Sequence, residues 1–391
     1  MKIGFEAQLL LDRHKTGIGW CADNLIRNLV QMEGHDEYQL QYFSLKEPGE
    51  RLKGLRQYED LGIKLRPCRW FRFVYYKLIW PFIPVPYSLF FGRECEVTQF
   101  FNFFVPPGVK GKRVTIVHDM AYKACPETVK LRTRQWLELV LKGSCRRADM
   151  IVTVSQFSKD ELIRYLGVPE EKIRVMHLGV DRSKFGSCHT PEKVRAVKER
   201  YHIKDRYYLY LGTIEPRKNI KRMIEAYGRL HDKMPDAPQL VLAGGRGWLC
   251  DDIYETAEAL NLGDDILFTG YVEDGEAPVL LAEAVAFLFP SLYEGFGIPP
   301  LEAMACGTPV LSSDRASLPE VLGDAALLVN PESVEAICRG MERLAKDGTL
   351  RGELSRKGSK RVQRFTWERS ARTLKEIYQE LSTLEESDAV V

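Results

Sequence analysis

Residues 289–310 read Phe289-Pro-Ser-Leu-Tyr-Glu-Gly-Phe-Gly-Ile-Pro-Pro-Leu-Glu-Ala-Met-Ala-Cys-Gly-Thr-Pro-Val310. The apolar run Ala284–Phe289 has the length of a buried strand, and the two consecutive prolines suit the first turn of a helix, where a backbone N–H lacks a partner. The pattern predicts a strand, a glycine-rich turn that contains Glu294, and a helix that contains Glu302. A helix N-terminus suits a phosphate and nearby carboxylates suit hydroxyl groups, so this segment predicts a site for a nucleotide sugar.

The composition is that of a soluble protein with two or three domains. Of the 391 residues, 45% are hydrophobic and 28% are charged, which supports substantial cores and argues against disorder. The nine cysteines are scattered without a Cys-x-x-Cys pair or zinc-like spacing, which argues against a disulfide framework or a structural metal. Met1–Ala7 has a strand pattern with an acidic residue rather than the pattern of a signal peptide, so we expect a cytoplasmic protein.

The two halves of the chain differ in charge. Residues 1–185 carry 30 Lys and Arg against 21 Asp and Glu, whereas the whole chain has a net charge of only +2. The basic first half predicts an anionic surface or acceptor as its partner, although drift of surface charge is the simpler alternative.

The second half alternates strand and helix patterns, which is typical of a parallel sheet covered by helices on both faces. We expect strands at Tyr207–Gly212, Gln239–Ala243, Asp265–Thr269, Ala284–Phe289, Pro309–Ser312 and Ala326–Val329, and helices at Ile220–Lys233, Asp252–Leu260, Glu276–Glu283, Pro300–Ala305 and Leu318–Leu322.

The first half follows the same alternation less clearly. We therefore expect an α/β fold with two Rossmann-like, doubly wound domains at 1–185 and 205–365, joined by a polar linker at 186–204. A C-terminal helix at 366–391 is expected to cross back to the first domain, and the cleft between domains is the expected site. The strands expected in the first half are Lys2–Ala7, Gln39–Ser44, Val114–His118, Met150–Val154 and Arg174–His177.

Two cations follow a predicted strand of the second domain. Arg217 and Lys218 lie in Thr213-Ile-Glu-Pro-Arg-Lys-Asn-Ile220, between a strand and a helix, and so at the carboxyl edge of a parallel sheet. They are candidate ligands of a diphosphate, because hydrogen bonds to charged groups contribute roughly 1.5–3 kcal/mol each. A solvated pair without a ligand is the alternative.

No Asp-x-Asp motif occurs in the sequence, so we expect no metal and no cofactor beyond a nucleotide-sugar co-substrate. The charge of the leaving group would then be met by Arg217, Lys218 and the backbone N–H groups of Gly295, Phe296, Gly297 and Ile298.

His118 and a glycine pair are the candidates in the first domain. His118 ends a predicted strand, so its imidazole is expected at the carboxyl edge, where it would position the sugar; a structural hydrogen bond is the alternative. Gly17-Ile-Gly19 begins a match to the dinucleotide fingerprint, but it follows the first strand by about ten residues and so argues weakly for a dehydrogenase. We expect a flexible loop whose N–H groups approach the donor, followed by a helix at Trp20–Val30.

Residues 66–91 combine aromatic side chains with Arg69, Arg72 and Lys77, while three prolines exclude a spanning helix. This composition suits the headgroup region of a membrane, although a core helix with a proline-rich loop fits equally well. With the basic first half, it predicts peripheral contact with anionic lipid.

The chain resembles the retaining glycosyltransferases of family four, which have the GT-B fold. The resemblance implies that Glu294 holds hydroxyls of the donor sugar, that Glu302 holds the ribose, and that His118 lies near the reacting carbon. It also implies that the first domain binds the acceptor. The motifs that carry the resemblance are Gly17-Ile-Gly19, His118-Asp119, Val154-Ser-Gln-Phe-Ser158, Gly179-Val-Asp181, Gly212-Thr-x-Glu-Pro-Arg-Lys-Asn219 and Glu294-x7-Glu302.

One motif indicates the branch of the family, and one residue departs from the family pattern. The Gly-Thr-x-Glu-Pro-Arg-Lys-Asn wording is similar to enzymes that add mannose or a 6-deoxy relative from GDP-sugars during synthesis of bacterial surface polysaccharide, including lipopolysaccharide. Many family members have Arg where Thr213 stands, which removes one cation from the expected diphosphate site. The resemblance implies a front-face reaction in which the leaving phosphate accepts the acceptor's proton.

The alternatives at this stage are a transferase of glucose or N-acetylhexosamine from UDP and a non-catalytic scaffold that binds nucleotide sugars. The sequence does not define the acceptor, which is a saccharide or a lipid-linked saccharide, and nothing in it indicates nucleic-acid binding.

Overall fold

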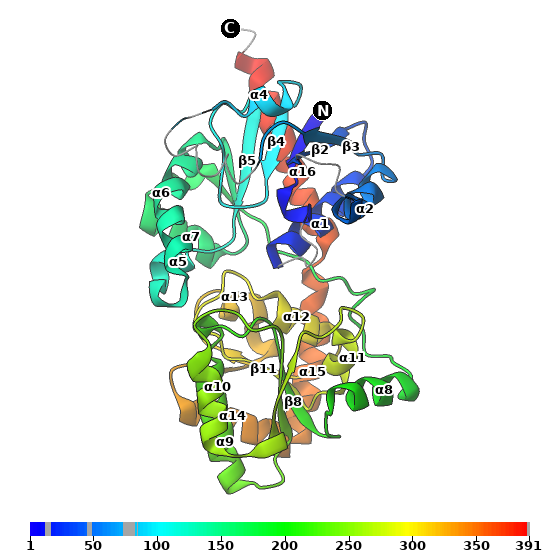
Figure 1. The fold of residues 1–391 in the computed structure, drawn as a ribbon, viewed down its shortest axis with the longest axis vertical. Helices are drawn as coiled ribbons and strands as arrows, with labels where there is room; N and C mark the ends of the chain where they lie inside the picture. Colours follow the sequence, from blue (N-terminus) through cyan, green and yellow to red (C-terminus); the bar gives the residue numbers. More distant parts are fainter. Residues whose placement is uncertain (12–16, 45–48, 73–82, 84, 389–391) are drawn as a thin grey trace. The chain divides into compact units, whose positions relative to one another are not determined.

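The computed structural model describes residues 1–11, 17–44, 49–72, 83 and 85–388 (Figure 1). These residues form two compact units. Unit 1 comprises Met1–Met120, Leu131–Leu178 and Trp367–Val391, and unit 2 comprises Ala121–Lys130 and Gly179–Thr366.

These boundaries differ from the expected ones in detail. The chain leaves unit 1 after Leu178 rather than at 185, and the expected linker 186–204 lies inside unit 2. Much of that linker is helix α8 (Pro191–Tyr201), whose N-cap Thr190 accepts a hydrogen bond from the Lys193 N–H. The polar composition that suggested a linker is that of a mostly exposed helix, in which only Val197 is buried.

Unit 1 contains a seven-stranded sheet in the order β3-β2-β1-β4-β5-β6-β7, in which neighbouring strands pair in parallel. The strand order reverses between β1 and β4, because the chain first builds outward through β2 and β3 and then returns to the other side of β1. The strands are β1 (Lys2–Glu6), β2 (Glu37–Phe43), β3 (Lys64–Cys68), β4 (Val97–Phe100), β5 (Lys112–Val117), β6 (Met150–Thr153) and β7 (Ile173–Val175).

Helices cover both faces of this sheet. Helices α1, α2 and α16 lie on one side and α6 and α7 on the other, with α16 packed against α1 (Figure 1). The C-terminal helix therefore belongs to the same unit as the N-terminal strand. The helices are η1 (Gln8–Leu11), α1 (Gly17–Val30), α2 (Gly49–Glu59), α4 (Ser88–Phe91), α6 (Leu131–Arg147), α7 (Gln156–Leu166), η3 (Glu170–Lys172) and α16 (Trp367–Asp388).

Unit 2 contains a six-stranded parallel sheet in the order β10-β9-β8-β11-β12-β13. The order reverses between β8 and β11, which are neighbours in the sheet although the chain visits β9 and β10 between them. The strands are β8 (Tyr207–Leu211), β9 (Gln239–Ala243), β10 (Ile266–Gly270), β11 (Ala286–Phe289), β12 (Val310–Ser313) and β13 (Leu327–Val329).

The helices of unit 2 also lie on both faces of its sheet. Helices α9, α10 and α14 pack together on one side, and α12 and α15 pack on the other (Figure 1). The helices are α5 (Ala121–Ala124), η2 (Pro126–Thr128), α8, η4 (Pro216–Lys218), α9 (Ile220–Lys233), α10 (Asp251–Leu260), η5 (Gly263–Asp265), α11 (Ala277–Glu283), α12 (Ile298–Ala305), α13 (Leu318–Leu322), η6 (Gly323–Ala325), α14 (Val334–Lys346), α15 (Gly348–Arg361) and η7 (Val362–Arg364).

Three tyrosines of β8 show how the centre of unit 2 is held. Tyr207, Tyr208 and Tyr210 are fully buried. Their hydroxyls donate to the carbonyls of Leu280, Met341 and Thr213 at 2.7–2.8 Å, so the large rings are buried without leaving a polar atom unsatisfied. β8 is thereby anchored to the segments around it.

The doubly wound α/β architecture expected from the sequence is confirmed, and the predicted elements of the second half match observed ones within two residues at each end. In the first half two strands were missed. β3 alternates exposed charged residues at the sheet edge, and β4 follows an aromatic-rich segment that hides its strand signal.

The prediction that Gly17–Gly19 belong to a flexible loop was wrong, because α1 begins at Gly17; residues 12–16 of the predicted loop lie outside the described residues. A glycine in a helix costs roughly 1 kcal/mol relative to alanine. The buried face of α1, which includes Cys21, Leu25 and Leu29, offsets that cost.

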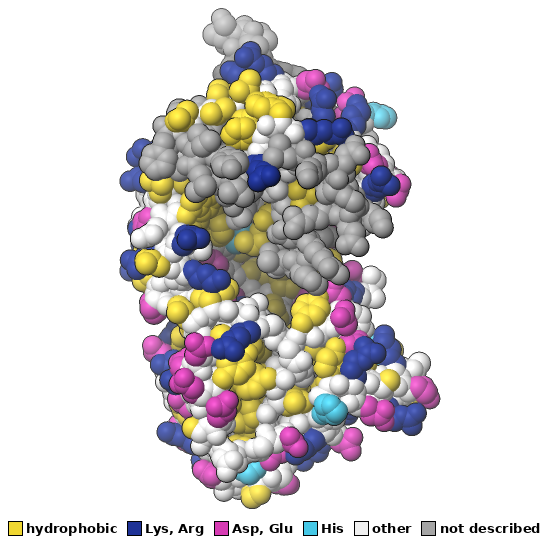
Figure 2. All heavy atoms as spheres, in the orientation of Figure 1, with side chains coloured by type: hydrophobic (Ala, Val, Ile, Leu, Met, Phe, Trp, Pro, Cys, Tyr) yellow, Lys and Arg dark blue, Asp and Glu magenta, His cyan; other side chains and the backbone are white. Residues whose placement is uncertain are grey.

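Acidic and basic side chains are interspersed over unit 2 on the face that Figure 2 draws. Unit 2 carries 27 Lys and Arg against 29 Asp and Glu, so the charge asymmetry between the two halves of the sequence is weak between the two observed units. Of the helices in the part of the chain that the structure describes, none combines the length and the apolar composition that crossing a membrane requires.

Candidate functional site

The turn after β8 presents the two predicted cations. Residues Pro216–Lys218 form the short helix η4, and Asn219 adopts a left-handed conformation (φ 61°) that ends η4 and begins α9. Asparagine tolerates this conformation better than most residues. Arg217 and Lys218 are therefore held in a tight turn at the carboxyl edge of the sheet.

The loop after β11 presents the predicted glutamate. Glu294 is 7% exposed, and Gly297 (φ 97°) is the N-cap of α12. The left-handed backbone favours glycine there, and a β-carbon at Gly297 would lie 2.7 Å from Leu318 Cδ2, so that the leucine side chain would have to shift. The glycine-rich turn predicted from the sequence is thus confirmed as the entry to α12.

The two loops meet in an ion network. Arg217 donates to Glu294 Oε2 at 2.9 Å and to Glu215 Oε1 at 2.8 Å, while Lys218 Nζ donates to Glu294 Oε1 at 2.7 Å. Arg217 also donates to the carbonyl of Tyr293 at 2.8 Å. The structure therefore brings together Arg217, Lys218 and Glu294, as the sequence predicted, and adds Glu215.

The network is buried, and burial determines its electrostatics. Burial alone would raise the pKa of Glu294, but the charges of Arg217 and Lys218 outweigh it and lower that pKa to about 2. Burial lowers the pKa of Lys218, and the charge of Glu294 opposes that shift. Glu294 is thus a carboxylate at neutral pH. An anionic ligand of the two cations would compete with this carboxylate.

Glu302 lies in α12, eight residues after Glu294, and takes no part in the hydrogen bonds that join Arg217, Lys218, Glu215 and Glu294. It is half-buried, and burial raises the pKa of Glu302 to about 7, with the charge of Lys184 opposing the rise. The two predicted glutamates therefore differ in protonation near neutral pH: Glu294 is ionised and Glu302 titrates.

The network occupies the position at which open α/β sheets bind ligands. In such sheets, ligands bind beyond the carboxyl ends of the strands where the strand order reverses. The loops that carry Arg217 and Glu294 follow β8 and β11, and these are the two strands between which the order of the unit 2 sheet reverses.

The remaining donor-site predictions fall on the same loops. Thr213 is exposed two residues after the end of β8, and its carbonyl accepts a hydrogen bond from the Tyr210 hydroxyl. Gly295, Phe296 and Gly297 are buried and lead into Ile298, the first residue of α12.

The other predicted residues belong to unit 1. His118 directly follows β5 and is 9% exposed, with Nε2 at 2.9 Å from the Phe101 carbonyl. A carbonyl only accepts, so Nε2 carries the proton. Burial lowers the pKa of His118 and the ring is neutral at pH 7. Gly17 and Gly19 lie in the first turn of α1 rather than in a loop.

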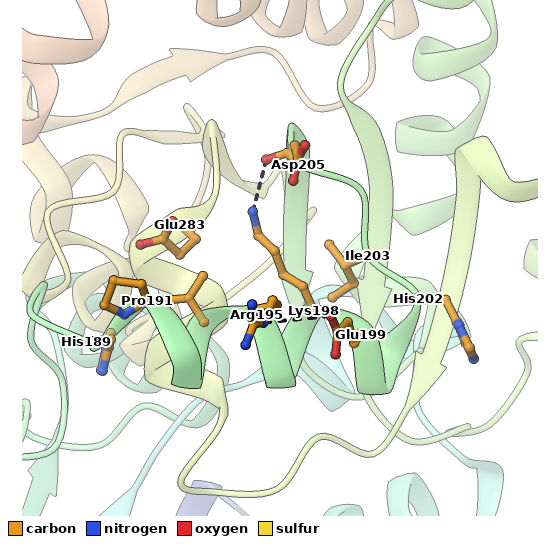
Figure 3. Close-up of a pocket in the computed structure, with 10 residues that line it drawn as sticks. His189, Pro191, Arg195, Lys198, Glu199, His202, Ile203, Asp205 and Glu283 are labelled. Carbon is orange, nitrogen blue, oxygen red and sulfur yellow. Dashed lines mark hydrogen bonds and ion pairs between the residues drawn. The ribbon is translucent and has the colours of Figure 1, made fainter.

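A hollow of about 660 Å³ elsewhere on unit 2 is not part of this site. It lies along α8, where Lys198 donates to the Asp205 carbonyl, and Glu283 lines its other side (Figure 3). Asp205 precedes β8 and Glu283 precedes β11, so the hollow lies at the amino edge of the sheet. Arg217 and Glu294 lie at the opposite edge.

Sequence reasoning missed three residues that hold the site together. Glu215 pairs with Arg217, and only its place in the same motif could have indicated it. Asn219 donates to the carbonyls of Pro290 and Pro331 at 3.0 and 2.7 Å. Ser317 donates to carbonyls of the Glu294 loop and lies 23 residues further along the chain, beyond the reach of any local pattern.

Within the described ranges, no three His, Cys, Asp or Glu side chains are grouped as ligands of a metal ion.

Two family models match nearly the whole chain. The model described as Glycosyltransferase Family 4 matches residues 16–184, and the model described as Glycosyl transferases group 1 matches residues 194–361.

The chain is also similar to bacterial proteins that are named as mannosyltransferases. It is 36% identical to the O-antigen chain mannosyltransferase B of Escherichia coli over 268 residues, which cover 68% of this chain and 70% of that protein. It is 30% identical to the O-antigen chain mannosyltransferase RfbU of Salmonella typhimurium over 285 residues, 72% of each chain. The serotype-specific mannosyltransferase WbdA of Escherichia coli is 34% identical over 229 residues, but the match covers only 28% of that protein.

Solved structures share the fold at low sequence identity. The Anabaena protein HepE in complex with UDP and glucose superposes with a TM-score of 0.73 at 17% identity, covering 97% of this chain and 100% of that chain. WaaG, a glycosyltransferase involved in lipopolysaccharide biosynthesis, gives a TM-score of 0.68 at 15% identity, with 97% of each chain covered.

Proposed function

The chain belongs to the glycosyltransferases of family four and group 1, and from this we propose that it transfers a hexosyl group from a nucleoside diphosphate to an acceptor of surface-polysaccharide or glycolipid synthesis. The group is mannose or a 6-deoxy relative, the donor nucleotide is GDP, and the acceptor is a saccharide or a lipid-linked saccharide. The O-antigen mannosyltransferases among its relatives support this choice.

The observation that carries the proposal is the meeting of Arg217, Lys218 and Glu294 where the strand order of unit 2 reverses. Two cations suit the diphosphate of a donor, and a carboxylate beside them suits sugar hydroxyls. In the ligand-free network Glu294 holds both cations, so the arriving diphosphate replaces part of that interaction and frees carboxylate oxygens for the sugar.

Other residues of unit 2 complete the donor site in this proposal. Glu302 accepts hydrogen bonds from the ribose, and the backbone N–H groups of Gly295–Ile298 face the developing charge. Thr213 is exposed at the same edge and contributes a hydroxyl where many relatives carry a cation.

Unit 1 holds the acceptor in this proposal. It also contributes to the binding of the donor. Since His118 Nε2–H donates to the Phe101 carbonyl, Nδ1 is the nitrogen that accepts a hydrogen bond from the donor sugar. Gly17 and Gly19 donate backbone N–H groups to the nucleotide-sugar donor from the first turn of α1, where such groups lack partners within the helix.

The proposed reaction retains the configuration at C1. The bond between C1 and the phosphate oxygen breaks, and its electron pair leaves with the nucleoside diphosphate. The acceptor oxygen bonds to C1 on the same face, and its proton moves to the departing phosphate oxygen. The chain's own cations carry the leaving charge, so we propose that transfer proceeds without a resident metal, and undiminished turnover in excess EDTA is the expected result.

Donor hydrolysis tests the proposal without knowledge of the acceptor. The protein is incubated with a panel of GDP- and UDP-sugars, and GDP-mannose or a GDP-6-deoxyhexose is expected to be hydrolysed slowly. Thermal shifts with GDP and UDP give the same comparison, since a ligand at 100 times its Kd stabilises by about 2.7 kcal/mol. A larger shift with UDP would replace the GDP assignment by a UDP-sugar.

Glu294→Gln separates catalysis from binding. We expect loss of hydrolysis with nucleotide binding retained. Asp265→Asn is the matched control, because Asp265 is also paired with a cation, Lys204 at 2.6 Å, but precedes β10 at the other edge of the sheet. Unchanged hydrolysis in Glu294→Gln would favour a scaffold that only binds nucleotide sugars.

We also propose that the protein is cytoplasmic and contacts anionic membrane through residues 66–91, of which 73–82 and 84 lie outside the described residues. Trp70 and Leu89 are 59% and 61% exposed. The Trp70 ring packs on Phe90 with centroids 5.1 Å apart, so an aromatic cluster is partly open to solvent here. Exposed aromatic rings beside cations suit a headgroup layer.

Liposome flotation tests this contact. Changing Arg69, Arg72 and Lys77 to Ser is expected to abolish binding to anionic vesicles, although Lys77 lies outside the described residues. The control changes three exposed cations of unit 2, Lys193, Arg195 and Arg356, to Ser and removes the same charge. Equal loss of vesicle binding in both variants would show that only net charge matters. Retained binding in the variant of residues 66–91 would show that this segment does not contact the membrane.

A further inference from the structure

Ser317 is a fully buried serine whose hydroxyl contacts the Glu294 loop twice. Its Oγ lies 2.9 Å from the Glu294 carbonyl oxygen and 3.2 Å from the Phe296 carbonyl oxygen. The Ser317 backbone N–H also points at the Glu294 carbonyl, at 3.4 Å. A hydroxyl has one hydrogen, so the two carbonyls share it in a three-centre bond.

These contacts fix the direction of two peptide groups. In a trans peptide the carbonyl of one residue and the N–H of the next point in opposite directions, and the described residues contain no cis peptide. Because the carbonyls of Glu294 and Phe296 point at Ser317, the N–H groups of Gly295 and Gly297 point away from it. The N–H groups of these two alternate residues are thus turned to the same side of the loop, and N–H groups that converge in this way suit an anion.

Residues 294–297 are also held by contacts with residues other than Ser317. The Phe296 ring packs edge-on against Phe365 with centroids 5.7 Å apart. Gly297 leaves no room for a β-carbon beside Leu318, the residue that follows Ser317. The peptide groups between Glu294 and Gly297 therefore have little freedom to turn.

The residue before Ser317 has an unusual backbone. Ala316 has φ 53°, a left-handed conformation that residues with a β-carbon rarely adopt. Such an outlier persists only where surrounding contacts impose it, and outliers of this kind cluster at functional sites. Here the imposed conformation directs both the hydroxyl and the N–H of Ser317 at the loop.

We propose that Ser317 is a positioning residue that turns the N–H groups of Gly295 and Gly297 toward the phosphates of the donor. The inference rests on the proposed function and deepens it. Ser317 itself does not touch the donor; it acts through the peptide groups that it orients. The ligand class it serves is a nucleoside diphosphate, which carries the anion that these N–H groups would meet together with Arg217 and Lys218.

The test compares nucleosides with their diphosphates. Dissociation constants for GDP and guanosine, and for UDP and uridine, are measured for the parent and for Ser317→Ala. We expect Ser317→Ala to raise the diphosphate Kd about tenfold, as fits the loss of hydrogen bonds to a charged group. The nucleoside Kd is expected to change less than about twofold, because the base and ribose do not depend on these peptide groups.

Three further variants interpret that result. Ser317→Thr keeps the hydroxyl and is expected to bind the diphosphate like the parent. Ser144→Ala is the matched control, because it removes another fully buried serine-to-carbonyl bond, to Val140 at 2.9 Å in unit 1, and is expected to change neither Kd. Ala316→Gly keeps the left-handed backbone, which glycine adopts without strain, and is expected to retain the parental diphosphate Kd with no loss of Tm.

The outcomes separate this inference from the proposed function. Parent-like diphosphate binding in Ser317→Ala, equal weakening of nucleoside and diphosphate, or equal losses in the Ala and Thr variants would each overturn the role of Ser317 while leaving the transferase proposal intact. If Ser317→Ala does not fold, Ser317→Cys, whose thiol is only a weak donor, takes its place, and an unchanged diphosphate Kd in that variant overturns the role. If the parent binds neither GDP nor UDP, the proposed function fails and this inference falls with it.

Discussion

Lys218 Nζ and Glu294 Oε1 lie 2.7 Å apart, although the two residues are 76 positions apart in the chain. Both side chains are largely buried, with 12% and 9% of their surfaces exposed. An ion pair that is removed from water in this way is costly to break from one side, because the remaining charge has no solvent to stabilise it. The pair therefore links the stability of unit 2 to the geometry of its candidate site.

A double-mutant cycle on this pair is expected to show strong coupling. Lys218→Met or Glu294→Gln alone leaves a buried charge with fewer partners and is expected to cost roughly 3 kcal/mol. The double variant is expected to cost less than the sum of the two by roughly 1–3 kcal/mol in urea unfolding. The exposed pair Lys221 and Asp252, 3.2 Å apart, is the control, with coupling below about 1 kcal/mol. Additive single effects at Lys218 and Glu294 would contradict the buried pairing.

Glu302 is expected to make the protein less stable as the pH rises. Its folded-state pKa of about 7 lies above the ordinary value of 4.5, so the folded state binds the proton more tightly between these pH values. The stability that this proton contributes is complete below pH 4.5 and is lost as the pH rises through 7.

Glu302→Gln mimics the protonated side chain. We expect it to match the parent in free energy of unfolding at pH 5 and to exceed it by on the order of 2 kcal/mol at pH 8. The control is Glu342→Gln, because Lys346 at 2.7 Å lowers the pKa of Glu342 and no gain at pH 8 is expected there. Equal stability of Glu302→Gln and the parent at pH 8 would show that Glu302 is not desolvated.

Asn219 is expected to tolerate glycine better than aspartate. Its side-chain amide donates to the carbonyls of Pro290 and Pro331, which fixes the Arg217 turn against two other loops. Asn219→Gly keeps the left-handed backbone and loses the amide, at a cost of roughly 1–3 kcal/mol. Asn219→Asp places a carboxylate against the same two carbonyls and should cost more.

The matched control for this comparison is Asn261, which has a similar left-handed backbone (φ 51°) at the end of α10 and is exposed. Changes to Gly and Asp there are expected to shift the free energy of unfolding by less than about 0.5 kcal/mol. The order of the Asn219 variants decides the matter: if aspartate is tolerated as well as glycine, the amide contacts are not what holds the turn.

Gly297→Ala is expected to distort the start of α12. The new β-carbon meets Leu318 at 2.7 Å and the backbone is in a region that alanine avoids, so we expect a loss of roughly 1–3 kcal/mol and weaker donor binding. Gly275→Ala, at a position with open space around it, is the control and is expected to retain parental Tm and binding. A parent-like Gly297→Ala variant would show that the loop has another conformation available.

Much of unit 2 could be predicted because its signals are local. The apolar run before Glu294, the prolines after it and the periodicity of α9 each depend on neighbouring residues, and the structure confirms these elements. The beginning of α1 at Gly17 was mispredicted because burial of one face outweighed its glycine content. Helix α8 buries only Val197, and the local signals that predict it, the Thr190 cap and Pro191 in the first turn, were overlooked. Pattern alone does not report how much of a face is buried.

The candidate site also has features that the sequence predicted and features that only the tertiary structure decided. That Arg217, Lys218 and Glu294 lie at the carboxyl edge of one parallel sheet follows from the order of amino acids, because each follows a strand and carboxyl ends of parallel strands share an edge. Three features depended on folding. Glu294 holds both cations, the pKa values of Glu294 and Glu302 move in opposite directions, and Ser317 contacts the loop that follows Glu294. Strand order brings distant loops together and burial removes their water, and neither quantity is a property of any short segment.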